Sequence, residues 1–260
     1  MAVIDIHSYL GAPPESVRTG TLKELSGIWR LAKINGALVA SGRGASGDFR
    51  RGNEAVQREI DGRANVWGLC TVNPNYPGES ADELRARLSG TLFRGLKVPR
   101  ATAGPRIDSP GMRAILSAAR RYGRPVLLET TCETDVRDAV SLAAEFHALR
   151  FILLGMGGPD WPSSIGIAEP QLNISLEIGS LEADADKVKD ALDAVGPRRI
   201  MFGSHFPLLH PLYVLGMVED SAIEPRDQER LLARNAVEAF ELEPIAALPG
   251  TREGDGSASE

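Results

Sequence analysis

Two of the four histidines stand at the ends of the first and last strand-like runs of the chain. His7 ends the run 3–7, and His205 follows the run 200–203. Imidazole serves proteins as a metal ligand, a general base and a proton carrier near neutral pH. If the two runs are neighbours in a closed sheet, both imidazoles enter one pocket, and we expect chemistry there.

Further polar residues stand at the ends of the runs between them. In a parallel barrel the carboxyl ends of the strands form the active-site rim. Glu129 ends the run 126–129, and Lys97 lies at the end of the run 93–98. We therefore predict that the catalytic residues are His205, Glu129 and His7, and that the substrate-binding residues are Lys97, Tyr9, Asn73, Trp161 and His210.

One interpretation of this group is a metal site. His7, Glu129 and His205 make a set of two histidines and one carboxylate, which leaves open positions for water and substrate and suits Zn, Mn or Fe(II). Such a metal lowers the pKa of a bound water to about 7.

The alternative interpretation has no metal. His205 is then a general base that titrates near neutrality, and Lys97 and Tyr9 hold an anionic substrate group or a developing oxyanion. A pKa of Glu129 above its reference value would favour a catalytic site over a silent one.

The elements that position these residues alternate along the chain. Short apolar runs at 3–7, 37–40, 66–71, 93–98, 126–129, 151–154, 172–178 and 200–203 predict eight strands. Most lack clean alternation, as strands covered on both faces do, although 172–178 alternates enough to predict a half-exposed strand. Eight strands alternating with helices in 260 residues predict a (β/α)8 TIM barrel.

Capping residues mark the helices. Thr21 predicts the start of the first helix, Ser80 the start of one over 81–88, and Ser109 with Pro110 the start of one over 112–122. The segment 155–171 has little helical pattern, so the sixth helix is expected to be short or irregular.

Several segments resemble a known family. VIDIHSYLG, FRGLKV, RPVLLET, FILLGMGG, RRIMFGSHFP and LLARNAVEAF are similar to successive strands and the final helix of the amidohydrolase superfamily, in its amidohydrolase-2 (aminocarboxymuconate-semialdehyde-decarboxylase-like) branch. The resemblance implies a metal-dependent-hydrolase-like barrel with a divalent metal, usually zinc. It also implies hydrolysis of amides and lactones, or non-oxidative decarboxylation.

The chain departs from that family at four of five ligand positions. Tyr9 replaces a histidine of the first strand, Glu129 and Gly155 replace those of the fifth and sixth, and His205 replaces the aspartate of the eighth. Only His7 is unchanged. A dinuclear site is therefore excluded, and the metal site is expected to be altered or absent.

Together, the rim residues and the family resemblance predict an amidohydrolase-like enzyme that hydrolyses or decarboxylates a small polar or carboxylate-bearing substrate. Two alternatives remain open. One is a catalytically silent barrel that serves as a binding or regulatory subunit, and the other is a metal-independent lyase, isomerase or cyclase.

Bulk properties limit the partners. The net charge of −6 argues against nucleic acid or an anionic membrane as the main partner. No apolar stretch reaches the roughly 18 residues of a membrane span, and no signal-like segment opens the chain, so we expect a cytoplasmic protein. The barrel is expected over residues 1–242 and a disordered tail over 243–260. Trp161 is expected to form a lid or to anchor a homodimer.

Overall fold

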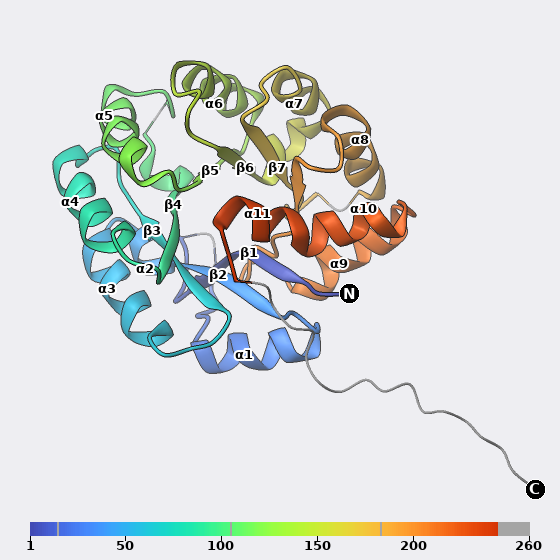
Figure 1. Ribbon diagram of the computed structural model, residues 1–260, viewed down its shortest axis with the longest axis horizontal. Helices are drawn as coiled ribbons and strands as arrows, with labels where there is room; N and C mark the ends of the chain where they lie inside the picture. Colours follow the sequence, from blue (N-terminus) through green and yellow to red (C-terminus); the bar gives the residue numbers. More distant parts are fainter. Residues whose placement is uncertain (15, 105, 183, 244–260) are drawn as a thin grey trace, which may run out of the picture.

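The computed structural model describes residues 1–14, 16–104, 106–182 and 184–243. Within these ranges eight strands form one sheet in chain order, and every neighbouring pair is parallel. Figure 1 shows the strands as an inner ring with helices outside it. The predicted (β/α)8 TIM barrel is confirmed.

The strands lie close to the predicted runs, with different ends. They are β1 (Ile4–Leu10), β2 (Gly36–Ser41), β3 (Val66–Thr71), β4 (Phe93–Val98), β5 (Val126–Glu129), β6 (Phe151–Leu154), β7 (Ile174–Glu177) and β8 (Ile200–Met201). The half-exposed seventh strand was a wrong prediction, because all of β7 is buried. Its alternation reflects polar residues that face the barrel interior, since barrel strands are covered on both faces.

The barrel closes where β1 meets the chain that follows β8. The backbone amide of Ile6 donates to the carbonyl of Phe202 over 3.2 Å, and that of Tyr9 donates to Phe206 over 2.8 Å. Ser8 and Phe206 form a parallel bridge. The first strand and the segment that follows the last strand therefore lie side by side at the rim.

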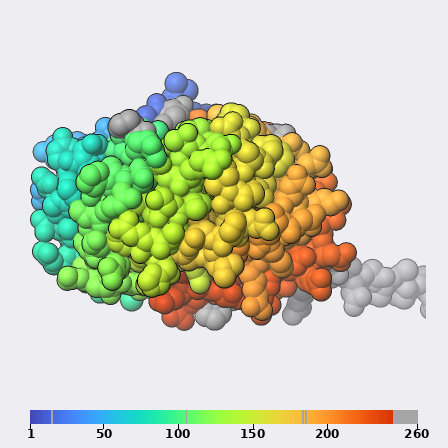
Figure 2. All heavy atoms as spheres, turned by 90° about the horizontal axis from the view of Figure 1, so that it is seen from above, coloured from blue at the N-terminus to red at the C-terminus, as the bar shows by residue number. Residues whose placement is uncertain are grey.

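Helices cover the outside of the ring and one of its ends. They are α1 (Leu22–Leu31), α2 (Gly42–Ala45), α3 (Phe49–Ile60), α4 (Pro77–Leu88), α5 (Pro110–Ala119), α6 (Glu133–Glu145), α7 (Trp161–Ala168), α8 (Ala185–Val195), α9 (Pro211–Asp220), α10 (Pro225–Glu229) and α11 (Asn235–Phe240). The surface in Figure 2 follows chain order from cyan to orange, as expected for successive strand–helix units. As predicted, α7 is short and follows an irregular turn over 155–160.

Two of the predicted caps are confirmed and one is wrong. Thr21 forms a capping box with Glu24, and the Ser109 hydroxyl accepts from the third residue of α5. Ser80 lies inside α4 instead, where its hydroxyl bonds to the backbone of Asn73. The helix begins earlier because Pro77 presets the backbone angle of a first helical residue.

Apolar side chains fill two layers. The larger layer lies between the strands and the helices. The smaller one fills the interior near the amino ends of the strands, where Ile4, Leu38 and Leu127 meet Phe240 of α11. In Figure 1 α11 lies across the middle of the ring. This end of the barrel is thus packed with hydrocarbon, and polar chemistry is left to the other end.

The predicted disordered tail, 243–260, lies outside the described residues from 244 onward. In the part of the chain that is described, no helix has both the length and the apolar character needed to cross a membrane.

Candidate active site

Three strands place charged side chains in the barrel interior, near the carboxyl ends of the strands. Leu128 of β5 and Leu176 of β7 pack outward among the helices, so the next residues, Glu129 and Glu177, face inward. Lys97 of β4 is fully buried and reaches Glu129. The strand pleat therefore collects two carboxylates and an ammonium at the carboxyl end.

A bulge in β1 aims His7 at the same place. Ile4 and Ile6 both pack in the interior, so strict alternation would turn His7 outward. The register between β1 and β2 shifts between Asp5 and Ser8, and the His7 amide donates to the Asp5 carboxylate over 3.0 Å. Bulges of this kind redirect side chains beside active sites.

His205 completes the group from the far end of the chain. Its backbone has a φ of 56°, a left-handed conformation that is strained for a residue with a Cβ. Its ring stacks on that of His7, with centroids 4.1 Å apart and planes at 22°. The proximity of these two imidazoles, expected from barrel closure, is confirmed.

Glu129 is the most heavily bonded member of the group. Its Oε1 lies 2.9 Å from the Lys97 ammonium and accepts from the Tyr9 hydroxyl. Its Oε2 accepts from the backbone amide of Arg100 over 2.8 Å. The nearest ring nitrogen of His7 is 3.7 Å from Oε1. This carboxylate is therefore rigidly oriented.

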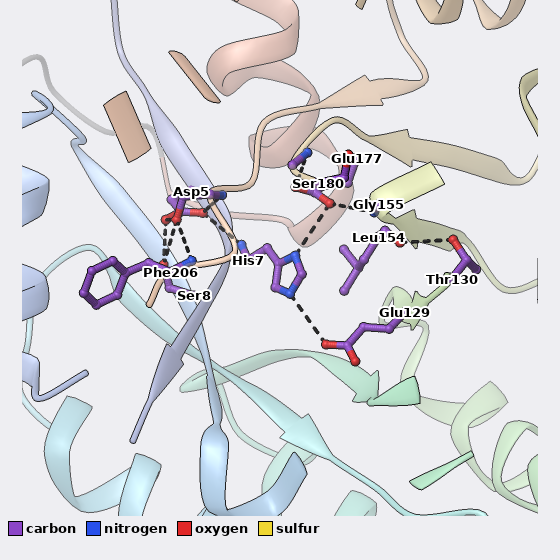
Figure 3. Close-up of polar contacts among 12 residues, drawn as sticks. Asp5, His7, Ser8, Glu129, Thr130, Leu154, Gly155, Glu177, Ser180 and Phe206 are labelled. Carbon is purple, nitrogen blue, oxygen red and sulfur yellow. Dashed lines mark hydrogen bonds and ion pairs between the residues drawn. The ribbon is translucent and has the colours of Figure 1, made fainter. Parts of the chain in front are cut away.

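Glu177 stands on the other side of His7. Its Oε2 lies 3.6 Å from Nδ1 of His7. Figure 3 draws this contact as a dashed line. The backbone amides of Gly155 and Gly179 donate to its two oxygens over 3.0 and 2.8 Å. His7 is thus flanked by two glutamates, of which the sequence prediction included only Glu129.

Burial acts differently on the two glutamates. Burial by itself raises the pKa of Glu129, but the Lys97 ammonium and the neighbouring His7 imidazole outweigh it and hold that pKa well below its usual range. For Glu177 burial dominates and raises the pKa to about 8. The pKa of Glu129 is therefore not raised, and the carboxylate whose pKa is raised is Glu177.

Both imidazoles are neutral at physiological pH. Burial lowers the pKa of His205 to about 4. Burial, with Lys97 and His205 adding to it, holds the pKa of His7 well below 6.5. The prediction that His205 titrates near neutrality is wrong, because removal from water disfavours the charged ring.

These residues open onto a cavity of about 560 Å³. His7, Glu129 and His205 line it beside apolar Leu154, Leu181 and Leu208 and several glycines. Among the lining residues that are described, Arg100 is the one permanent cation. Its Nε donates to both oxygens of the buried Asp135 over 2.9 Å, which fixes the guanidinium in place.

None of the five predicted substrate-binding residues lines this cavity. Lys97 and Tyr9 are buried beneath it, with the Lys97 ammonium 3.6 Å from the centroid of the Tyr9 ring. Lys97 therefore holds Glu129 rather than facing the open space. The side-chain oxygen of Asn73 accepts from the backbone and side-chain nitrogens of Asn75.

Trp161 and His210 need a correction. Trp161 is only 9% exposed and packs in the core as the first residue of α7, so the prediction of a lid or a dimer anchor is wrong. The neighbouring Asp160 and Ser163 are exposed, whereas the Trp161 side chain is buried. His210 caps α9, where its Nδ1 accepts from the amide of Leu212 over 3.2 Å.

The sequence analysis missed three residues near the cavity. Arg100 and Ser180 each lie a few residues beyond a strand, and Glu177 ends one. Their position on the rim was the available signal. Distinguishing them from other rim residues required the turn geometry that follows each strand.

The donor set fits a divalent metal. His7, Glu129 and His205 place one ligand atom each within 4.8 Å of one another. Both ring nitrogens of His7 are buried and make no hydrogen bond within the described part of the chain, which is costly unless another partner binds there. Metal ligands must be neutral imidazoles and ionised carboxylates, and the pKa shifts of these residues favour those forms.

Residues 40–242 match the model of the amidohydrolase family, Amidohydro_2. The chain belongs to this family. The resemblance to its amidohydrolase-2 branch is thereby confirmed. The protein matches no curated sequence.

Solved structures share the fold of this amidohydrolase at low identity. It superposes on 5-carboxyvanillate decarboxylase from Sphingomonas paucimobilis with a TM-score of 0.76 and 12% identity, covering 93% of this chain and 99% of the other. A dihydroxybenzoic acid decarboxylase from Polaromonas sp. JS666, with bound manganese and the inhibitor 2-nitroresorcinol, gives 0.74 and 15%, covering 96% and 99%. An amidohydrolase from Burkholderia multivorans with bound zinc gives 0.75 and 15%, covering 94% and 100%.

Proposed function

We propose that this protein is a divalent-metal-assisted decarboxylase of a small carboxylate-bearing substrate. The observation that carries the proposal is the convergence of His7, Glu129 and His205 on one wall of the cavity. Their ligand atoms lie within 4.8 Å of one another, and both His7 nitrogens lack hydrogen bonds within the described part of the chain.

The metal would be held by these three side chains. Zn, Mn and Fe(II) all accept two imidazoles and a carboxylate. A bound divalent ion supplies positive charge that stabilises electron density developing on the substrate. Lys97, Tyr9 and the Arg100 amide keep Glu129 ionised and oriented for this role.

Arg100 provides the second anchor. Its guanidinium is the permanent cation among the described lining residues, and Asp135 holds it in one orientation. A fixed guanidinium pairs well with a carboxylate or a phenolate of the substrate. We therefore assign Arg100, in place of Lys97, to bind negative charge on the substrate.

Decarboxylation suits the electrostatics of the site better than hydrolysis through a general base. A base that activates water works best with a pKa near the operating pH, and that of His205 is about 4. Loss of CO2 requires an oriented carboxylate against an apolar wall, such as Leu154, Leu181 and Leu208 provide. Decarboxylases among the structurally similar proteins support the same choice.

Two measurements test the proposal. Metal analysis of the purified protein should find about one divalent ion per chain, and His7→Ala should lose it. His147→Ala is the matched control, because His147 is exposed. CO2 release should then be assayed over a panel of small aromatic and aliphatic carboxylic acids, with Mn, with Zn and with a chelator.

The expected result is metal-dependent CO2 release from at least one acid, with a higher KM in Arg100→Met. Equal metal content in His7→Ala and wild type would contradict the assigned ligands. Stoichiometric metal without CO2 release, but with ester or amide hydrolysis that a chelator abolishes, would favour metal-dependent hydrolysis instead. Absence of metal and of turnover would favour a silent binding barrel.

A further inference from the structure

Lys187 is a buried amine that the proposed decarboxylation does not use. It lies in α8 and is completely buried. Within the described residues, no carboxylate oxygen comes within 4.0 Å of its Nζ. Its partners are the carbonyl of Gly155, at 3.4 Å, and the hydroxyl of Ser180. A buried ammonium without an ion-pair partner is costly, which favours the neutral amine.

Ser180 connects this amine to the cavity. It follows β7 by three residues and is itself almost fully buried, yet it lines the cavity beside Gly155 and Gly179. Figure 3 places it next to Glu177 and Gly155. A hydroxyl bonded to a buried amine, at the wall of a substrate-sized cavity, is the arrangement of a serine nucleophile with a lysine base.

We propose that Ser180 and Lys187 form a nucleophile–base pair that gives the protein a second, metal-independent activity as a hydrolase of small esters. Ser180 lines the cavity, whereas its partner Lys187 is fully buried and is not among the lining residues. Neither Ser180 nor Lys187 hydrogen-bonds directly to His7, Glu129 or His205 within the described part of the chain, although Gly155 and Glu177 lie between Lys187 and His7. Substitution of a metal ligand should therefore leave the pair in place.

The step is an acyl transfer. Neutral Lys187 takes the proton of the Ser180 hydroxyl, and the oxygen attacks the ester carbonyl carbon to form a tetrahedral adduct. The bond to the alkoxide then breaks, and the alkoxide leaves with the proton from Lys187. Water attacks the resulting acyl-serine, again losing its proton to Lys187. The bond from the acyl carbon to the Ser180 oxygen then breaks, and this oxygen takes the proton back from Lys187. The products are an alcohol and a carboxylic acid.

The charges around Lys187 are compatible with this role. Burial lowers the pKa of Lys187 to about 8, while Glu177 from β7 and Glu182 and Asp184 from the chain before α8 act to raise it. A base that titrates this close to neutrality is present as free amine in a useful fraction and can still return its proton.

The experiment uses diisopropyl fluorophosphate on the full chain. In the expected reaction Ser180 displaces fluoride from phosphorus, and Lys187 takes the serine proton. Intact mass should show one adduct per chain, and peptide mapping should place it on Ser180. Ser180→Ala should abolish the adduct, and Ser163→Ala, which alters an exposed serine, should not.

Lys187→Met should slow labelling about a hundredfold, since a general base contributes on that order. Lys189→Met, on the exposed side of the same helix, is the matched control. Labelling of Lys187→Met within about twofold of wild type would overturn the pair, as would an adduct on any other residue. A chelator should leave labelling unchanged, whereas metal dependence would assign the reactivity to the decarboxylase site.

A second measurement covers the case in which Lys187→Met does not fold. The wild-type labelling rate, corrected for reagent hydrolysis, should rise with pH through about 8. Glu177 also titrates there, so the same profile is measured in Glu177→Gln. If the labelling rate still rises with pH in Glu177→Gln, Lys187 is supported as the base. A flat profile in wild type, or one lost in Glu177→Gln, overturns it.

Discussion

Asp5 of β1 binds Ser204, which lies three residues beyond β8, through the backbone and the side chain of Ser204. The Ser204 amide donates to one carboxylate oxygen over 2.8 Å, and its hydroxyl donates to the other over 2.6 Å. Asp5 also accepts from the His7 amide and the Ser8 hydroxyl. One buried carboxylate thus joins the first strand to the last and fixes the residues beside both imidazoles.

Removal of this carboxylate should weaken closure of the barrel. Asp5→Ala leaves several buried donors without an acceptor, so we expect the free energy of unfolding to fall by about 2–4 kcal/mol. Urea denaturation measures this fall. Ser204→Ala removes only one of the donors and should cost about 1 kcal/mol. Equal losses in the two variants would show that Asp5 does not organise this junction.

The Lys97–Glu129 ion pair should be strongly coupled. Lys97→Met leaves Glu129 as a buried anion without its ammonium, which should lower the free energy of unfolding by about 3–5 kcal/mol. The double variant Lys97→Met/Glu129→Gln should be more stable than the sum of the two single losses predicts, because it removes both charges.

The corresponding exposed pair provides the control. Arg43→Met breaks a surface ion pair with Asp48 and should cost less than about 1 kcal/mol. A coupling energy near zero between Lys97 and Glu129 would mean that the remaining partners of Glu129, Tyr9 and the Arg100 amide, suffice to hold it.

Glu177 should make stability fall as the pH rises. Its pKa is about 8 in the folded protein and 4.5 in the reference state, so the folded state binds more protons between these values. The stabilisation is complete below pH 4.5 and is lost as the pH approaches 8. From pH 6.5 to 8 the loss should be about 1–2 kcal/mol, since each pKa unit corresponds to about 1.4 kcal/mol.

Between pH 6.5 and 8, the titration of Glu177 can be told apart from that of its neighbours by its effect on stability. The lowered pKa of His205, about 4 against 6.5, makes stability rise with pH below 6.5. The pKa of Lys187 is about 8 against 10.5, so its titration changes stability only above about pH 8. Urea denaturation of the chelator-treated protein at pH 6.5 and 8 measures the effect. Glu177→Gln should abolish the difference, and an unchanged pH dependence in that variant would assign it to another group.

Much of this architecture follows from local patterns. Eight short apolar runs alternating with helices predicted the barrel, because two-sided burial leaves a recognisable run in each strand. Barrel closure then made His7 and His205 neighbours without any knowledge of coordinates. Glu129 joined them because it ends a strand, and strand ends form one rim.

The sequence by itself determined the fold and the two imidazoles and carboxylate that share its rim. The tertiary structure alone decided what each of them can do. The β1 bulge turns His7 inward, Lys97 pairs with Glu129, and Asp135 holds Arg100 at the cavity wall. All three depend on contacts between distant segments. The pKa shifts follow from the same contacts, because desolvation and neighbouring charges exist only once the strands have been brought together.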